Sequence, residues 1–177
     1  MKVLNNKFFY RRKDLYMKIT KIATAVMATL ALGSTAMAAS SGTLLLQGTV
    51  SVVNDIVVAA NTANNTSLNI TGGETGKNVA TVTETSNNLN GYKIKISSPT
   101  GGELRHTTNS AQKTTYKIGY DGAASVTPTV AGVVVKNVTA LTGLTTDTSE
   151  VAVDVTAYAN AAAGTYQDTL TIAIEAN

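Results

Sequence analysis

The sequence predicts an all-β protein, an antiparallel two-sheet β-sandwich of about eight strands. Three observations lead to this fold class. Apolar residues alternate with polar ones in several short runs, as strands with one buried face require. Turn signals rich in Gly, Asn and Asp separate those runs at fairly even spacing. No segment after residue 39 has the 3.6-residue period of a helix. A closed barrel is the structural alternative.

Residues 1–38 are predicted to be an N-terminal extension and signal peptide. A cationic start, a short apolar run and a small-x-small cleavage pattern follow one another: Lys18 and Lys21, residues 22–32, and Ala36-Met37-Ala38. We favour Met17 as the true initiator and Ala39 as the mature start. The apolar run is shorter than the roughly 20 residues that a transmembrane helix needs, and no later run approaches that length. We therefore expect export to the periplasm, cell surface or exterior, with no transmembrane segment in the mature chain.

The charge of the remaining residues, 39–177, differs in sign from that of the whole chain. Of the 14 basic residues, 7 lie before residue 39, where Asp14 is the one acidic residue, so residues 39–177 carry 7 basic and 10 acidic residues, a formal charge of −3. This balance does not favour nucleic-acid binding. The chain has no cysteine, so stability must come from burial of Val, Ile and Leu and from sheet hydrogen bonds. Residues 39–177 are long enough for one domain.

The first predicted strand is residues 42–53, directly after the export signal. Its apolar positions fall on one face with a glycine between them: Leu44, Leu46, Gly48, Val50 and Val52. The polar positions Thr43, Gln47, Thr49 and Ser51 fall on the other. A strand at this place either closes its own sheet or completes that of a neighbour.

The next strands are predicted from alternation and from the turns that end them. Residues 56–58 resume an extended run after Asn54-Asp55, and residues 66–71 end at a Gly-Gly pair. Residues 78–86 carry Ala80 and Val82 on one face, before a hairpin turn at Asn90-Gly91.

The second half of the chain continues in the same way. Residues 92–97 alternate most clearly, with Lys93 and Lys95 toward solvent, and residues 114–120 place three large side chains on one face. Residues 103–111 are ambiguous. Residues 130–139 contain a valine run, and residues 151–156 alternate valine with small or polar residues. The last strand, opened by Gly164, carries the apolar face Tyr166, Leu170, Ile172 and Ile174.

Both ends of this domain resemble a known family. The alternating segment 42–53 resembles the N-terminal region of subunits of bacterial chaperone–usher pili. The closing Gly164-Thr165-Tyr166-Gln167-Asp168-Thr169-Leu170-Thr171-Ile172 resembles the last strand of pilins and of the spore coat protein U-like group. The resemblance implies an immunoglobulin-like sandwich that lacks a strand, which the N-terminal segment of the next subunit supplies by β-augmentation. Leu44, Leu46, Gly48, Val50 and Val52 would then be donor positions, and Tyr166, Leu170, Ile172 and Ile174 would line the acceptor.

The expected function is thus a secreted structural subunit of a bacterial fibre or coat, with itself or a periplasmic chaperone as partner. The alternative is a self-complete adhesin or carbohydrate-binding module, with a host or cell-surface glycan as partner. No enzyme motif, catalytic residue, metal-ligand spacing or cofactor site is predicted. His106 is interpreted as a solvated loop residue, Asp168 as an acid that satisfies backbone donors at a strand entrance, and Tyr158 as a free tyrosine.

Overall fold

A computed structural model describes residues 40–177. The predicted signal peptide, the initiator at Met17 and the mature start at Ala39 lie outside the described residues. Residues 48–177 form one compact unit, and residues 40–47 belong to a separate one. Among the described residues, no helix is both long and apolar enough to span a membrane.

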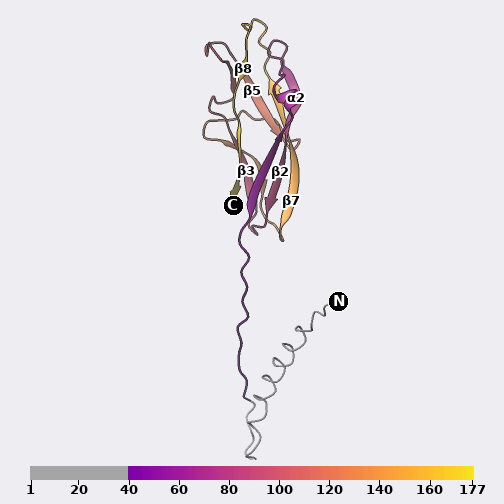
Figure 1. Cartoon of the computed structure of the whole chain (residues 1–177), viewed down its shortest axis with the longest axis vertical. Coiled ribbons are helices and arrows are strands. Elements are labelled where there is room, and N and C mark those ends of the chain that lie inside the picture. The colour runs from indigo at the N-terminus through magenta and orange to yellow at the C-terminus, as the bar shows by residue number, and fades with distance from the viewer. Residues whose placement is uncertain (1–39) are drawn as a thin grey trace, which may run out of the picture. The chain divides into compact units, whose positions relative to one another are not determined.

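The described chain is almost entirely β, in two antiparallel sheets, which confirms the predicted all-β fold class (Figure 1). The six-stranded sheet has, in spatial order, β1 (Asn54–Ala60), β2 (Glu74–Ser86), β7 (Thr145–Val155), β5 (Lys113–Tyr120), β4 (Glu103–His106) and β8 (Tyr166–Gln167). The three-stranded sheet has the order β6 (Val133–Val138), β3 (Tyr92–Ser97), β9 (Thr171–Ala176). The short helix α2 (Thr62–Asn65) follows β1.

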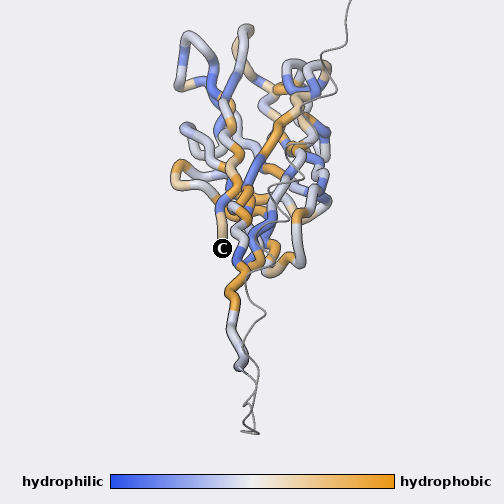
Figure 2. The backbone as a smooth tube through the Cα atoms, turned by 60° about the horizontal axis from the view of Figure 1, so that its bottom comes forward, coloured by the Kyte–Doolittle hydropathy of each residue, from blue (hydrophilic) through white to orange (hydrophobic). Residues whose placement is uncertain are grey.

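The core is built by the inward faces of the central strands. Val82, Ile94, Ile96 and Ile118 are each 0% exposed, and they come from β2, β3 and β5. Val151, Val153 and Val155 of β7 and three tyrosines, Tyr92, Tyr116 and Tyr120, complete it. Figure 2 shows hydrophobic and hydrophilic residues following one another closely along much of the chain. Alternation places these residues, because successive side chains of a strand point to opposite faces.

Several predicted elements are wrong in position or type. Residues 42–53 belong to no strand, and residues 66–71 form no strand either. A helical turn occurs at α2, where none was predicted. The predicted last strand is two strands, β8 and β9, which pair in different sheets, so Tyr166 does not share a strand face with Ile172 and Ile174.

The predicted hairpin at Asn90-Gly91 is wrong, because β2 and β3 lie in different sheets and do not pair, but a tight turn does join them. The amide of Gly91 donates to the carbonyl of Asn88, at 2.8 Å. Gly91 has φ +79°, and a Cβ there would collide with the carbonyl oxygen of Val138. Both the positive φ of Gly91 and the close approach of β6 require glycine at this position.

A buried polar cluster joins the two sheets inside this core. The carboxylate of Glu84, on β2, is 0% exposed. It accepts hydrogen bonds from Tyr120 at 2.5 Å, Tyr92 at 2.7 Å and Ser149 at 2.8 Å. The ammonium of Lys136, on β6, lies 3.1 Å from the same carboxylate and 2.6 Å from Asp147. No buried side-chain nitrogen or oxygen in the described part of the chain lacks a partner.

The cluster shifts the pKa of each of its members. Burial by itself raises the pKa of Glu84, but the four donors more than offset this, so that the pKa of the carboxyl is lowered. Burial and the nearby carboxylate raise the pKa of Tyr92 and Tyr120. Burial lowers the pKa of Lys136, but hydrogen bonds to Asp147 and Glu84 dominate and raise it. The folded protein therefore holds an ionised Glu84, a protonated Lys136 and neutral tyrosines.

Removing the Glu84 charge is expected to destabilise the fold. We expect Glu84→Gln to lower the free energy of unfolding by roughly 3 kcal/mol, the lower end of the cost of breaking a buried ion pair, because Lys136 keeps Asp147. Urea unfolding followed by circular dichroism measures the change. Glu150→Gln, on the exposed face of β7, is the matched control, with an expected change within about 0.5 kcal/mol. Equal effects of the two substitutions would contradict this role of Glu84.

Stability is also expected to fall at both ends of the pH range. Lowered carboxyl pKa values contribute stability above the ordinary value of 4.5 for Glu84, and the contribution is lost as the pH falls through the folded-state pKa. The raised tyrosine pKa values contribute below pH 10.0, and that contribution is lost at higher pH. Urea midpoints measured between about pH 2 and 11 should form a plateau with two falling limbs. Glu84→Gln should flatten the acid limb only in part, because the pKa of Asp147 is also lowered.

Candidate functional site

The outer strands β1 and β9 end the two sheets at the same side of the sandwich. β1 pairs only with β2, and β9 pairs only with β3. The two strands are near each other, so two unpaired backbone edges lie close together. We call Asn54–Ala60 together with Thr171–Ala176 the open edge.

The inward side chains of the open edge are apolar and incompletely covered. Ile172 and Ile174 lie opposite Ile96 and Ile94 in the β3–β9 register and share their face. Both are only half-buried, whereas Ile96 and Ile94 are 0% exposed.

On β1 the contrast is larger. Val58 lies opposite Val82 in the β1–β2 register, yet it is 47% exposed and Val82 is 0% exposed. Ile56, two residues earlier and facing the same way, is half-buried. The apolar core therefore continues to the last strand of each sheet without being covered there.

The predicted first strand is exposed and unpaired. We call residues 40–53 the extension. Leu44, Leu46, Val50 and Val52 are between 66% and 86% exposed. No strand pairing in the described chain includes any of residues 40–53. The predicted strand is therefore not formed within the described residues.

The two other sheet edges are protected. β8 has only two residues, which is too short to template another strand. The β3–β6 pairing has a register shift between Ile94 and Lys95, and Lys136 of β6 turns inward to Glu84. Bulges and inward charges are devices that keep edges from pairing. β6 also has an exposed valine, Val134 at 47%, but within residues 40–177 the open edge is where two edge strands with uncovered apolar side chains lie close together.

The chain that leads into β9 is fixed by the residues of its Gly-x-Tyr-x-Asp motif. The ring of Tyr166 packs edge-on against His106, with centroids 5.1 Å apart. Gly164 has φ +147°, and a Cβ there would overlap the His106 ring, so glycine is required. His106 ends strand β4, is half-buried, and places Nε2 3.0 Å from the carbonyl of Ala163. The interpretation of His106 as a solvated loop residue is therefore wrong.

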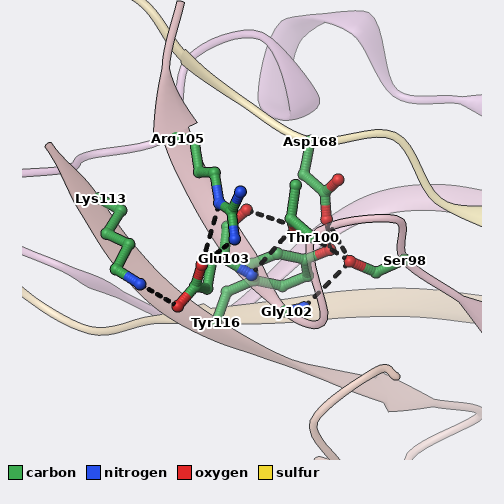
Figure 3. A network of polar contacts seen from close by, with 8 residues as sticks. All are labelled: Ser98, Thr100, Gly102, Glu103, Arg105, Lys113, Tyr116 and Asp168. Carbon is green, nitrogen blue, oxygen red and sulfur yellow. Dashed lines mark hydrogen bonds and ion pairs between the residues drawn. The ribbon is translucent and has the colours of Figure 1, made fainter. Parts of the chain in front are cut away.

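Asp168 ties the switch between the two sheets to the core (Figure 3). Its Oδ2 accepts hydrogen bonds from Ser98, after β3, at 2.6 Å and from Tyr116 of β5. The hydroxyl of Ser98 in turn accepts a hydrogen bond from the amide of Gly102 at 3.0 Å. Burial and this hydrogen bond to Asp168 raise the pKa of Tyr116, so its hydroxyl remains a donor. Asp168 accepts from one backbone donor, the amide of Thr169 at 2.8 Å, but its other two donors are the side chains of Ser98 and Tyr116 and not the expected backbone groups.

Comparison with known proteins adds no family to these observations. No protein-family model matches the chain, and no curated protein sequence matches it. The open edge and the extension are therefore the features that bear on function.

Little in the described residues resembles a catalytic centre. No group of three or more His, Cys, Asp or Glu side chains in residues 40–177 is placed to hold a metal ion. Lys136 is the amine closest to buried carboxylates, but its raised pKa keeps it protonated and therefore not nucleophilic. Its chemistry in this position is electrostatic.

The structure also corrects or extends the sequence interpretation at single residues. Tyr158 is not free, because its hydroxyl donates to Gln112 at 2.8 Å. Glu84 was not singled out from the sequence, although a glutamate at a period-two position on the face of Ala80 and Val82 was a signal for a buried carboxylate. Leu170 precedes β9 and packs on the core with Ile172 and Ile174.

Asp168 is expected to hold β9 in place. Asp168→Asn removes the charge that strengthens the bonds from Ser98 and Tyr116, and we expect a loss of roughly 1–3 kcal/mol in unfolding free energy. Amide hydrogen exchange of Thr171–Ala176 should become faster than in the parent protein. Asp55→Asn, on the exposed face of β1, serves as the control. If β9 exchanges at the parent rate in Asp168→Asn, the anchoring role is wrong.

Proposed function

We propose that this protein is a secreted structural subunit of a bacterial surface fibre or coat, in which the extension of one copy adds a strand to the open edge of the next. One observation carries the proposal. The same chain has an uncovered apolar edge and an unpaired segment whose apolar residues alternate with the period of a strand. The inserted strand and the edge that receives it are then two parts of one sequence, as a polymer of identical subunits requires.

The dimensions and the chemistry of the two parts agree. At about 3.3 Å per residue, residues 44–52 would span roughly 30 Å as a strand, enough to cover β1 and β9, each roughly 20 Å long. The open backbone edges would supply ladder hydrogen bonds and no sequence preference, whereas Ile172, Ile174 and Val58 would contact the inserted side chains. The subunit resembles chaperone–usher pilins in these two features, so a periplasmic chaperone that occupies the same edge before assembly is the expected partner.

Burial supplies the driving force. Leu44, Leu46, Val50 and Val52 are largely exposed in the subunit. Their burial contributes roughly 1.5–3 kcal/mol each before the cost of ordering the segment. Backbone hydrogen bonds between the inserted strand and the open edge add to the stabilisation by burial. Dissociation must break all of these hydrogen bonds together. A slowly dissociating polymer follows.

One substitution in the extension tests strand donation directly. Leu46→Asp puts a charge on the apolar face and is expected to abolish the heat-resistant high-molecular-weight ladder of the exported protein on a denaturing gel, as should deletion of residues 39–50. Gln47→Asp, which adds the same charge to the opposite face, is the matched control and should leave the ladder intact. The subunit fold should not change in either variant, because neither side chain belongs to a strand.

Two outcomes would contradict the proposal. A parent protein that runs only as a monomer would exclude polymerisation, and a monomer that binds glycans would favour an adhesin. Equal loss of the ladder in Leu46→Asp and Gln47→Asp would mean that the alternating face is not the contact.

A further inference from the structure

The last residues of the extension are held by one residue, Asn87, through its side chain and its backbone amide. The amide of Val53 donates to Asn87 Oδ1 at 2.7 Å, and Asn87 Nδ2 donates to the carbonyl of Ser51 at 2.8 Å. The backbone amide of Asn87 donates to the carbonyl of Val53 at 3.2 Å. Asn87 directly follows Ser86, which lies opposite Asn54 at the start of β1. Val53 opposite Asn87 is the next pair of the same register, so Ser51–Val53 prolong the line of β1 (Figure 1).

The direction of Ser51–Val53 determines which edge the extension can reach, because the extension is joined directly to β1, one side of the open edge. The chain enters β1 at Asn54, and the extension has enough residues to reverse and lie along the edge of its own subunit. A reversal at Val53 and Asn54 would need only a tight turn of about two residues. All four apolar side chains, Leu44, Leu46, Val50 and Val52, would then be available to their own subunit, which would be closed to a second copy.

The contacts of Asn87 are incompatible with that reversal. While Ser51 and Val53 are bound to Asn87, any turn must lie before Ser51. Val52 then stays on the outgoing side of the turn and Val50 lies in the turn or on that same side, so only Leu44 and Leu46 are left to fold back. A second copy can receive all four, because the extension meets it without turning.

We propose that Asn87 is a positioning residue that keeps the extension out of the open edge of its own subunit and so directs it to a second copy. The inference rests on the proposed strand donation. It assigns a role to a residue whose sequence context, Asn87-Asn88-Leu89-Asn90-Gly91, indicates only a turn.

The test compares substitutions at adjacent asparagines of the full chain, produced by export. Asn87→Ala removes both side-chain bonds to the extension. Asn88→Ala is the control, because Asn88 lies in the same turn and its side chain accepts from Asn90 at 3.2 Å and not from the extension. Asn87→Asp keeps an acceptor for Val53 but loses the donor to Ser51, and serves if Asn87→Ala folds poorly. Two quantities are measured: the ratio of monomer to heat-resistant polymer, and amide hydrogen exchange of residues 44–52 in the monomer fraction.

In Asn87→Ala we expect the monomer-to-polymer ratio to rise at least about fourfold, since the variant loses two hydrogen bonds and each changes an equilibrium by roughly two- to tenfold. In its monomer, residues 44–52 should be protected from exchange, whereas they should exchange freely in the parent and in Asn88→Ala. A variant that loses stability while residues 44–52 still exchange freely would show a merely structural role and overturn the proposal. So would an unchanged ratio.

The same data separate this inference from the proposed function. If the parent forms no polymer but residues 44–52 become protected only in Asn87→Ala, the positioning role holds and strand donation to a second copy fails. If the parent forms polymer and all three variants equal it in both measurements, strand donation holds and the role of Asn87 is wrong.

Discussion

The uncovered core at the two outer strands is the constraint on which the rest of the structure depends. In a sandwich each sheet must bury one face, and the inward residues of an edge strand are covered only if the opposite sheet reaches them. Here the six-stranded sheet ends at β1 and the three-stranded sheet ends at β9, and Val58 remains 47% exposed on the inward face. A chain without cysteine has no disulfide to compensate for that deficit. An additional strand would cover these apolar side chains and would also provide hydrogen-bond partners for the unpaired backbone groups of β1 and β9.

The polar core explains how the sheets stay together while that edge is open. Glu84, Lys136 and their hydroxyl partners connect β2, β3, β5, β6 and β7, so they link both sheets without any side chain of β1 or β9. Such bonds are directional and have one geometry, whereas apolar contacts alone would let two sheets of unequal size slide. Asp168 does the same at the other end, where the chain changes sheets between β8 and β9. The open edge and the polar contacts that hold the two sheets together are therefore built from different residues.

Alternation in the sequence was sufficient for β3 and β5, predicted only the second half of β7 and was insufficient at the edges. β3 and β5 were predicted almost to the residue, because both have a buried face with period two. The same period in residues 42–53 indicates a face that can be buried, but it holds no information on which sheet buries it. The predicted last strand failed at Asp168, where the backbone changes sheets while the apolar pattern continues through Leu170 and Ile172. Asn87 was beyond sequence reasoning, since its partners, Ser51 and Val53, are more than thirty positions away.

Gly48 is best understood through the proposed assembly. Nothing lies within 4 Å of a Cβ built at Gly48, so the subunit itself gives no reason for glycine there. Glycine in the middle of an apolar, alternating segment weakens its intrinsic tendency to form strands, which disfavours pairing between exposed extensions. Between β1 and β9 of the open edge, Gly48 would cost little stability, because hydrogen bonds to both strands would fix its backbone. The missing side chain would also allow the two strands to approach closely. A segment with this composition is selective for a preformed edge over another copy of itself.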